Sequence, residues 1–282
     1  MSAKTLEGLL RRDRLLVAAS LAGLFLLAWL FLFHLALEME AMEGAAARMM
    51  GMPTRDALWA LLSAAFNPGA AALASAAVNF ALVALMWGAM MVGMMLPSAA
   101  PTILLFSALE RKRENAGRIG GRTASFVAGY FAIWSLFSIA AAAAQTALSH
   151  AGLVSMQMAA TSTVLAGAIL VGAGLYEFTP LKDRCLTHCR SPLDWIPTHM
   201  RPYRFGAFRM GMEHGAYCVG CCWVLMLILF VGGVMNLVWI ALIAALVLAQ
   251  KLLPRGPIVA RLAGVALAGW GIVLIARPLL ST

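Results

Sequence analysis

Charge is the property that this sequence most clearly lacks. Lys, Arg, Asp and Glu make up 12% of the 282 residues, whereas hydrophobic residues make up 62%. Soluble domains carry roughly 25% charged residues, so a value this low indicates a chain that lies in lipid. Several apolar runs reach the about 20 residues that a helix needs to cross a bilayer. The composition therefore predicts an all-α, polytopic membrane protein in which residues 1–282 form a single integral membrane domain.

Acidic residues are missing from the hydrophobic runs, except for Glu177 at the end of one run. Proton relays and transporters of hard cations normally carry carboxylates within the membrane. Their scarcity here argues against proton-coupled transport and against transport of manganese or magnesium. The sequence also shows no nucleotide-binding loop and no set of nucleophile, base and acid. It does not predict an enzyme.

Basic residues occur mainly between the apolar runs, so the net charge of +9 indicates how the loops are oriented rather than binding to nucleic acid. With the most basic loops placed inside, the sequence predicts about seven membrane spans, with the N-terminus inside and the C-terminus outside. These spans are expected at 15–37, 70–109, 124–148 and 158–178, in a hairpin of two spans through 215–252, and at 258–276. The polar segment at about 179–213, rich in Cys and Arg, is then cytoplasmic.

The apolar run at 70–109 is long enough for either one span or two. Pro97 and Pro101 interrupt it, which fits a kinked helix or a turn. The loop that follows, Arg111–Arg122, is the most basic in the chain, and a single crossing places it inside. We therefore expect one long, proline-kinked span, with the Ser98 hydroxyl bonded to a carbonyl that a proline leaves free.

Cysteine is scarce and confined to one part of the chain. The chain has five cysteines, and an odd number cannot form a closed set of disulfides. Three of them lie within five positions, one helical turn after a histidine, and all four side chains share one helix face: His214, Cys218, Cys221 and Cys222. Single cysteines are common as small hydrophobes in membrane helices, but this density predicts a metal or redox site.

The other two cysteines, Cys185 and Cys189, flank His188 in the predicted cytoplasmic segment. Nearby Lys182 and Arg184 would favour the thiolate form, which binds metals. The spacing differs from that of a standard structural zinc motif, and a solvated loop is the simpler alternative. If the two cysteine clusters meet, up to five thiols converge on one site at the cytoplasmic side.

Methionine is concentrated in the long span. Five lie within ten positions and form two rows at helical spacing, Met86, Met90 and Met94 in one and Met91 and Met95 in the other. Methionine is a flexible filler of hydrophobic cores, so packing is the alternative to ligation. Further methionines fall in the loops predicted to lie outside: Met39, Met42, Met49, Met50, Met52, Met156 and Met158.

The two kinds of sulfur side chain are therefore predicted in different places: the cysteines at the cytoplasmic side, and these methionines within the membrane and outside it. Thiols stay reduced in the cytosol, and soft sulfur ligands select Cu(I). We accordingly predict a Cu(I)-binding membrane protein that serves copper uptake or delivery to a cuproenzyme, with Zn as the alternative metal. Its expected partners are the lipid bilayer and a metallochaperone or membrane cuproenzyme. Two other functions fit the pattern: a non-catalytic accessory or assembly subunit of a larger membrane complex with a structural metal, and a membrane thiol oxidoreductase.

Three motifs together resemble one bacterial family. They are Trp87–Ser98, Tyr176–Pro192, and Gly215–Trp223 running on to Met235 and Asn236. The family comprises predicted metal-binding integral membrane proteins, sometimes labelled copper chaperones, and the resemblance covers roughly residues 80–275. It implies a bundle of about six or seven helices, a bound metal, and a multi-pass protein of the bacterial inner membrane.

Overall fold

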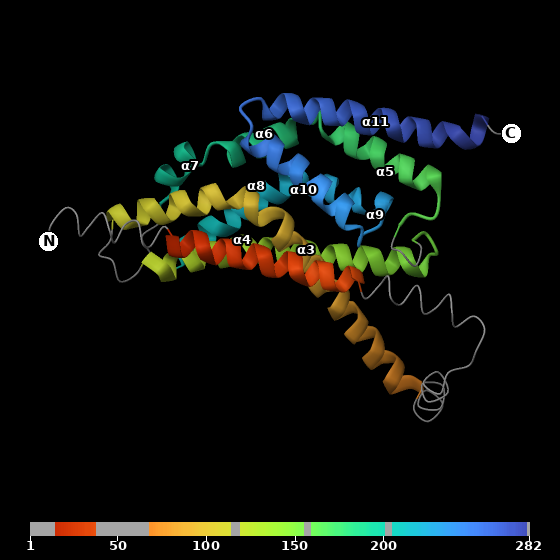
Figure 1. The fold of residues 1–282 in the computed structure, drawn as a ribbon, viewed down its shortest axis with the longest axis horizontal. Coiled ribbons are helices and arrows are strands. Elements are labelled where there is room, and N and C mark those ends of the chain that lie inside the picture. The colour runs from red at the N-terminus through yellow and green to blue at the C-terminus, as the bar shows by residue number, and fades with distance from the viewer. Residues whose placement is uncertain (1–14, 38–67, 114–118, 155–158, 201–204, 281–282) are drawn as a thin grey trace.

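The computed structural model describes residues 15–37, 68–113, 119–154, 159–200 and 205–280, and the regular secondary structure within these ranges is helical apart from one isolated bridge between Val154 and Ala160. An N-terminal helix, Leu15–Leu37, comes first. It is followed by α3 (Pro68–Arg113), α4 (Ile119–His150), α5 (Thr163–Tyr176), α6 (Pro180–Arg190), α7 (Pro192–His199), α8 (Gly206–Leu227), α9 (Leu229–Gly232), α10 (Leu237–Leu252) and α11 (Gly256–Leu280). Figure 1 shows these helices stacked in a bundle, with α5 and α11 side by side along one edge.

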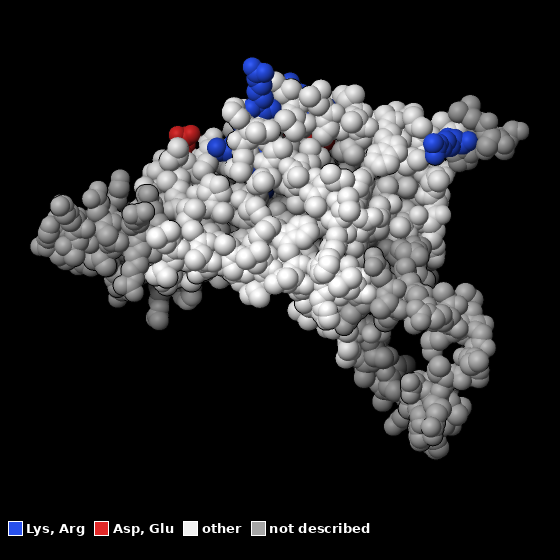
Figure 2. Space-filling model, viewed as in Figure 1, with Lys and Arg blue, Asp and Glu red and all other residues white. Residues whose placement is uncertain are grey.

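Five described helices are long and apolar enough to cross a membrane: Leu15–Leu37, Val78–Arg111, Gly120–His150, Gly206–Gly232 and Gly256–Arg277. The bent pair α5 and α6 would add a sixth span, and α10 is a shorter apolar helix. The face drawn in Figure 2 carries few charged side chains, and these lie along its upper edge. The prediction of an all-α fold with several helices of membrane length is confirmed. The number of seven crossings and their orientation stay predictions.

The long apolar run forms one helix, as expected. Helix α3 is continuous from Pro68 to Arg113 and contains Pro97 and Pro101. The expected role of Ser98 is wrong in detail. Its hydroxyl donates to the carbonyl of Met95, 2.9 Å away. The carbonyl that Pro97 leaves free, four residues earlier, instead accepts the indole N–H of Trp29 at 3.4 Å.

Helices α4 and α8 cross at glycines. A Cβ atom at Gly129 would lie 2.0 Å from the carbonyl oxygen of Phe208, and one at Gly211 would lie 2.0 Å from that of Phe126. No side chain fits at either position, so the two backbones approach closely, as small residues allow in membrane helices. This crossing brings Tyr130 of α4 against the first cysteine of α8.

Within the predicted hairpin of two spans at 215–252, α8 is long enough to cross a membrane and α10 is a shorter apolar helix, so the second crossing stays a prediction. Helix α9 ends at Gly232, and the φ of 91° at the following Gly233 lies in the left-handed region that glycine adopts without strain. The side chain of Asn236 then accepts the backbone N–H of Trp239 at 3.1 Å and caps α10. The hairpin returns the chain to the end of the bundle where α6 lies.

The segment after α5 is not a solvated loop. The chain bends by 64° between α5 and α6, and α6 packs against α8. Lys182 is fully buried and forms an ion pair with Glu177. The amide of Gln250 on α10 accepts from Lys182 at 2.9 Å and donates to Glu177 at 3.0 Å. This network removes the solvated-loop alternative for the start of α6.

Candidate metal centre

All five cysteines gather where α6 meets α8. Each is a free thiol and each is buried. Cys185 lies directly over the α8 backbone, because a Cβ at Gly220 would be 2.7 Å from its Sγ. Tyr176 at the end of α5 donates its hydroxyl proton to the carbonyl of Gly220. These contacts hold the bend between α5 and α6 against α8, so the two cysteine clusters of the sequence form one group.

The thiols are connected to one another. Cys189 of α6 lies close to Cys218 and Cys221 of α8. Within α8, the thiols of Cys221 and Cys222 donate to the carbonyl of Cys218 at 3.1 and 3.0 Å. We call Cys189, Cys218, Cys221 and Cys222 the thiol centre. Its sulfur atoms come from two helices, and the pair across them that is nearest in sequence, Cys189 and Cys218, is 29 positions apart.

A lysine that the sequence interpretation did not include among the ligands reaches the thiol centre from α10. The ammonium of Lys251 donates to the Sγ of Cys218 at 2.9 Å and to the Oγ of Ser98 at 3.2 Å. The hydroxyl of Tyr130 lies 3.0 Å from the same sulfur. In the sequence, Lys251 stands at the end of an apolar run and marks a loop boundary. That position was the only sign in the sequence that it could belong to the site.

Two neighbouring residues of α10 serve two different buried groups. Gln250 belongs to the network with Glu177 and Lys182, whereas Lys251 faces the thiol centre. The end of α10 is held by Arg190 of α6, whose guanidinium donates to the carbonyls of Gln250 at 2.7 Å and Pro254 at 2.9 Å. Helix α6 therefore positions both its own cysteines and the lysine.

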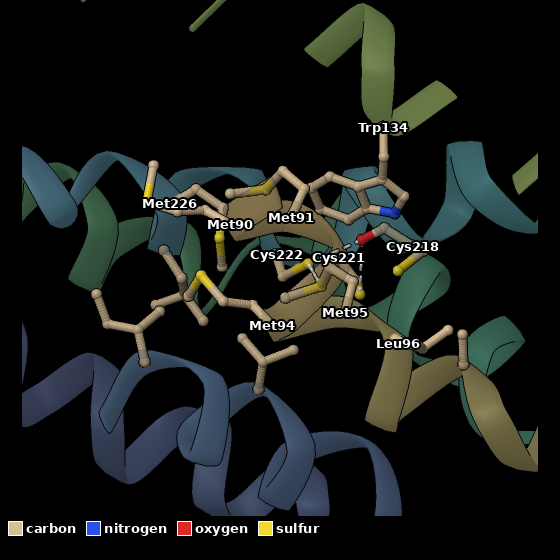
Figure 3. Packing of buried hydrophobic residues seen from close by; sticks show 14 of the residues in the cluster. Met90, Met91, Met94, Met95, Leu96, Trp134, Cys218, Cys221, Cys222 and Met226 are labelled. Carbon is tan, nitrogen blue, oxygen red and sulfur yellow. Dashed lines mark hydrogen bonds between the residues drawn. The ribbon is translucent and has the colours of Figure 1, made fainter. Parts of the chain in front are cut away.

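The methionine rows of α3 continue from the thiol centre. The thiol of Cys222 lies 3.8 Å from the Sδ of Met95. All five predicted methionines, Met86, Met90, Met91, Met94 and Met95, are at most 5% exposed. Figure 3 shows four of them grouped with the cysteines, together with Met226 of α8, which the sequence analysis did not select. The seven methionines predicted to lie outside fall beyond the described residues.

The two predicted histidines lie beside the thiol centre in an aromatic enclosure. His214, 3% exposed, packs against Phe126 and Tyr130, with ring centroids 6.2 and 5.6 Å away. His188 stacks on Tyr217 at 3.7 Å. The two imidazole rings are 6.5 Å apart.

The centre is not a preformed cage. Within the described part of the chain, no three side chains among His, Cys, Asp and Glu are arranged to hold a metal ion. Structural zinc sites use four such ligands in a tetrahedron, so the described geometry does not match one. The arrangement offers pairs of sulfur atoms with a cationic side chain beside them.

Apolar helices of membrane length surround a buried group of thiols and thioethers, the side chains that prefer soft metals. A family model matches residues 84–274, which include every predicted ligand, and the chain belongs to this family, PpoB2, described as copper chaperone. The family expected from the three sequence motifs is thereby confirmed. No curated protein and no solved structure was found to match the chain.

Proposed function

We propose that this protein binds Cu(I) within the membrane and passes it on, by way of the methionine rows of α3 and the thiol centre. The observation that carries the proposal is the contact of 3.8 Å between Met95 and Cys222, which joins the thioethers to the thiols. Family membership supports copper as the metal. The residues predicted to lie between the two membrane surfaces then form a continuous series of sulfur ligands.

The chemistry of the donors fits Cu(I) as cargo. Thioethers and thiolates are soft ligands that prefer Cu(I) to hard cations. Cu(I) accepts as few as two such ligands, so it needs no preformed cage. Zinc, the alternative metal, prefers four ligands in a tetrahedron, and the described residues present no group of that kind.

Movement along the series follows from ligand strength. Met86 and Met95 are nine positions apart on one helix, which corresponds to about 14 Å at 1.5 Å per residue. Cu(I) would exchange one thioether for the next and then reach thiolates, which bind it more tightly because they carry charge. We infer that the ion moves toward the thiol centre and leaves from there for a partner protein, which is a cuproenzyme or a metallochaperone.

Lys251 balances charge at the end of this path. A Cu(I) ion held by two thiolates carries one net negative charge, which is costly in a low-dielectric interior. The ammonium 2.9 Å from Cys218 supplies the opposite charge. The metal and the lysine therefore stabilise the same thiolate from different sides.

The decisive experiment is a Cu(I) competition titration of the purified protein and of a variant with all five cysteines replaced by serine. We expect tight binding by the wild type that the five-serine variant loses. Metal analysis of freshly purified protein accompanies it. Equal affinities in the two proteins, or one tightly bound zinc in place of copper, would contradict the proposal. The zinc result would favour the accessory subunit with a structural metal.

A further inference from the structure

Two imidazole nitrogens beside the thiol centre have no hydrogen-bond partner. Among the described residues, Nδ1 of His214 and Nε2 of His188 are buried and unpaired. Buried ring nitrogens are normally hydrogen-bonded, and each exception calls for a physical explanation. Neither nitrogen is hydrogen-bonded to a sulfur of the thiol centre, and the ammonium of Lys251 contacts that centre through Cys218.

The distance between the two rings suits a single ion. An imidazole nitrogen binds a metal at about 2 Å and lies roughly 1 Å from the centre of its ring, so two rings facing one ion have centres about 6 to 6.5 Å apart. The centroids of His188 and His214 are 6.5 Å apart. The ring centres of His188 and His214 therefore have the spacing of two imidazoles that bind one ion.

The surroundings favour a soft monovalent cation. Trp195 of α7 lies against both histidines, with ring centroids 4.8 Å from His188 and 6.0 Å from His214. Phe126 and Tyr130 of α4 also stack on His214. Aromatic faces attract cations, and an enclosure of this kind excludes the water that would otherwise satisfy the unpaired nitrogens.

The pair is adjacent to the thiol centre but separate from it. His214 lies one helical turn before Cys218 on α8, and His188 directly precedes Cys189 on α6. Tyr130 contacts both groups, because its ring packs on His214 while its hydroxyl bonds to Cys218. The imidazoles lie on the side of the thiols where α7 covers them.

We propose that His188 and His214 form a second, two-nitrogen Cu(I) site, distinct from the thiol centre, through which the ion leaves the thiols. This inference rests on the proposed function. Neutral imidazoles bind Cu(I) less tightly than thiolates do. The histidine site therefore binds the ion transiently and transfers it to a partner protein. In this arrangement Trp195 lies against the site from which the ion leaves the protein.

The test separates the two sites by removing the thiols. In detergent, the five-serine variant is titrated with Cu(I) against a weak competitor, and its metal environment is measured by X-ray absorption. We expect one residual Cu(I) with nitrogen neighbours and no sulfur. Adding His188→Asn and His214→Asn should lower that residual affinity by at least about 100-fold, the upper end of what loss of a supporting residue alone costs a metal site. His150→Asn, at an exposed end of α4, is the matched control and should change nothing.

A second measurement uses intact thiols and guards against misfolding. In the wild-type background, the double histidine variant should keep its affinity for Cu(I) but release the ion to an external chelator about tenfold more slowly. His188→Asn alone, at a less buried position, should show part of the same delay. Absence of residual binding in the five-serine variant, or residual binding that the histidine substitutions leave unchanged, would overturn the second site. Failure of the thiol centre would instead appear as equal affinity of the wild type and the five-serine variant.

Discussion

The ammonium of Lys251 lies 2.9 Å from the sulfur of Cys218, although the two residues belong to different helices and both are buried. The serine hydroxyl at position 98 completes the environment of the ammonium at 3.2 Å. A cation held this close to a thiol determines what else that sulfur binds, because it offsets the charge of a thiolate. Helices α3, α8 and α10 thus meet at the ammonium group of Lys251.

Replacing this lysine tests its role in charge balance. Lys251→Leu removes the charge without adding a sulfur ligand, so a Cu(I) bis-thiolate in the site becomes a buried net anion. We expect the affinity for Cu(I) to fall by about tenfold or more, which corresponds to about 1.4 kcal/mol. The measurement is the competition titration, with Arg255→Leu at an exposed position as the control. An affinity equal to or above that of the wild type would refute charge balance.

Met95→Leu tests the link between the thioethers and the thiols. Leucine fills nearly the same volume, and such exchanges usually cost less than about 1.5 kcal/mol of stability. We expect equilibrium binding at the thiols to persist while the rate of Cu(I) loading falls, because the contact with Cys222 is lost. Stopped-flow mixing with a Cu(I) donor measures that rate. Met210→Leu is the matched control, since Met210 is equally buried but lies outside the methionine rows. Equal loading rates in the two variants would indicate that the methionine rows serve only to pack the core.

The buried pair of Glu177 and Lys182 should matter for stability. Removing one partner leaves an uncompensated charge in the interior, which typically costs about 3–5 kcal/mol. We therefore expect Glu177→Gln and Lys182→Met each to lower the melting temperature in detergent. The double variant should recover part of the loss, because neither charge is then left alone. A double variant less stable than both single variants would contradict this account.

The glycine crossing of α4 and α8 gives a prediction about geometry. Gly211→Ala places a Cβ that would lie 2.0 Å from the carbonyl of Phe126, so the helices must separate. We expect a loss of about 1–3 kcal/mol, together with weaker Cu(I) binding as Tyr130 moves away from Cys218. Thermal unfolding and the titration are measured on the same samples. Gly88→Ala is the control, because nothing lies within 4 Å of its added Cβ. Identical behaviour of the two variants would refute the crossing.

The sequence by itself determined the helical membrane class, the single long α3 and the turn between α8 and α10. Each depends on local physics: hydrophobic length, the absence of charge, and the glycine and asparagine at positions 233 and 236. It also determined which ligands share a helix face, because offsets of three and four are fixed by the helix itself. Membership of the family followed from the order of three local motifs.

The tertiary structure decided which faces meet. Nothing in the spacing of Cys185 and Cys189 shows that the α5–α6 bend packs them on α8, or that Arg190 holds the end of α10 so that Lys251 reaches Cys218. These contacts join residues far apart in the chain, and they depend on how closely helix backbones approach. That approach is set by pairs of small residues on different helices, such as Gly129 and Gly211, whose partnership exists only in three dimensions.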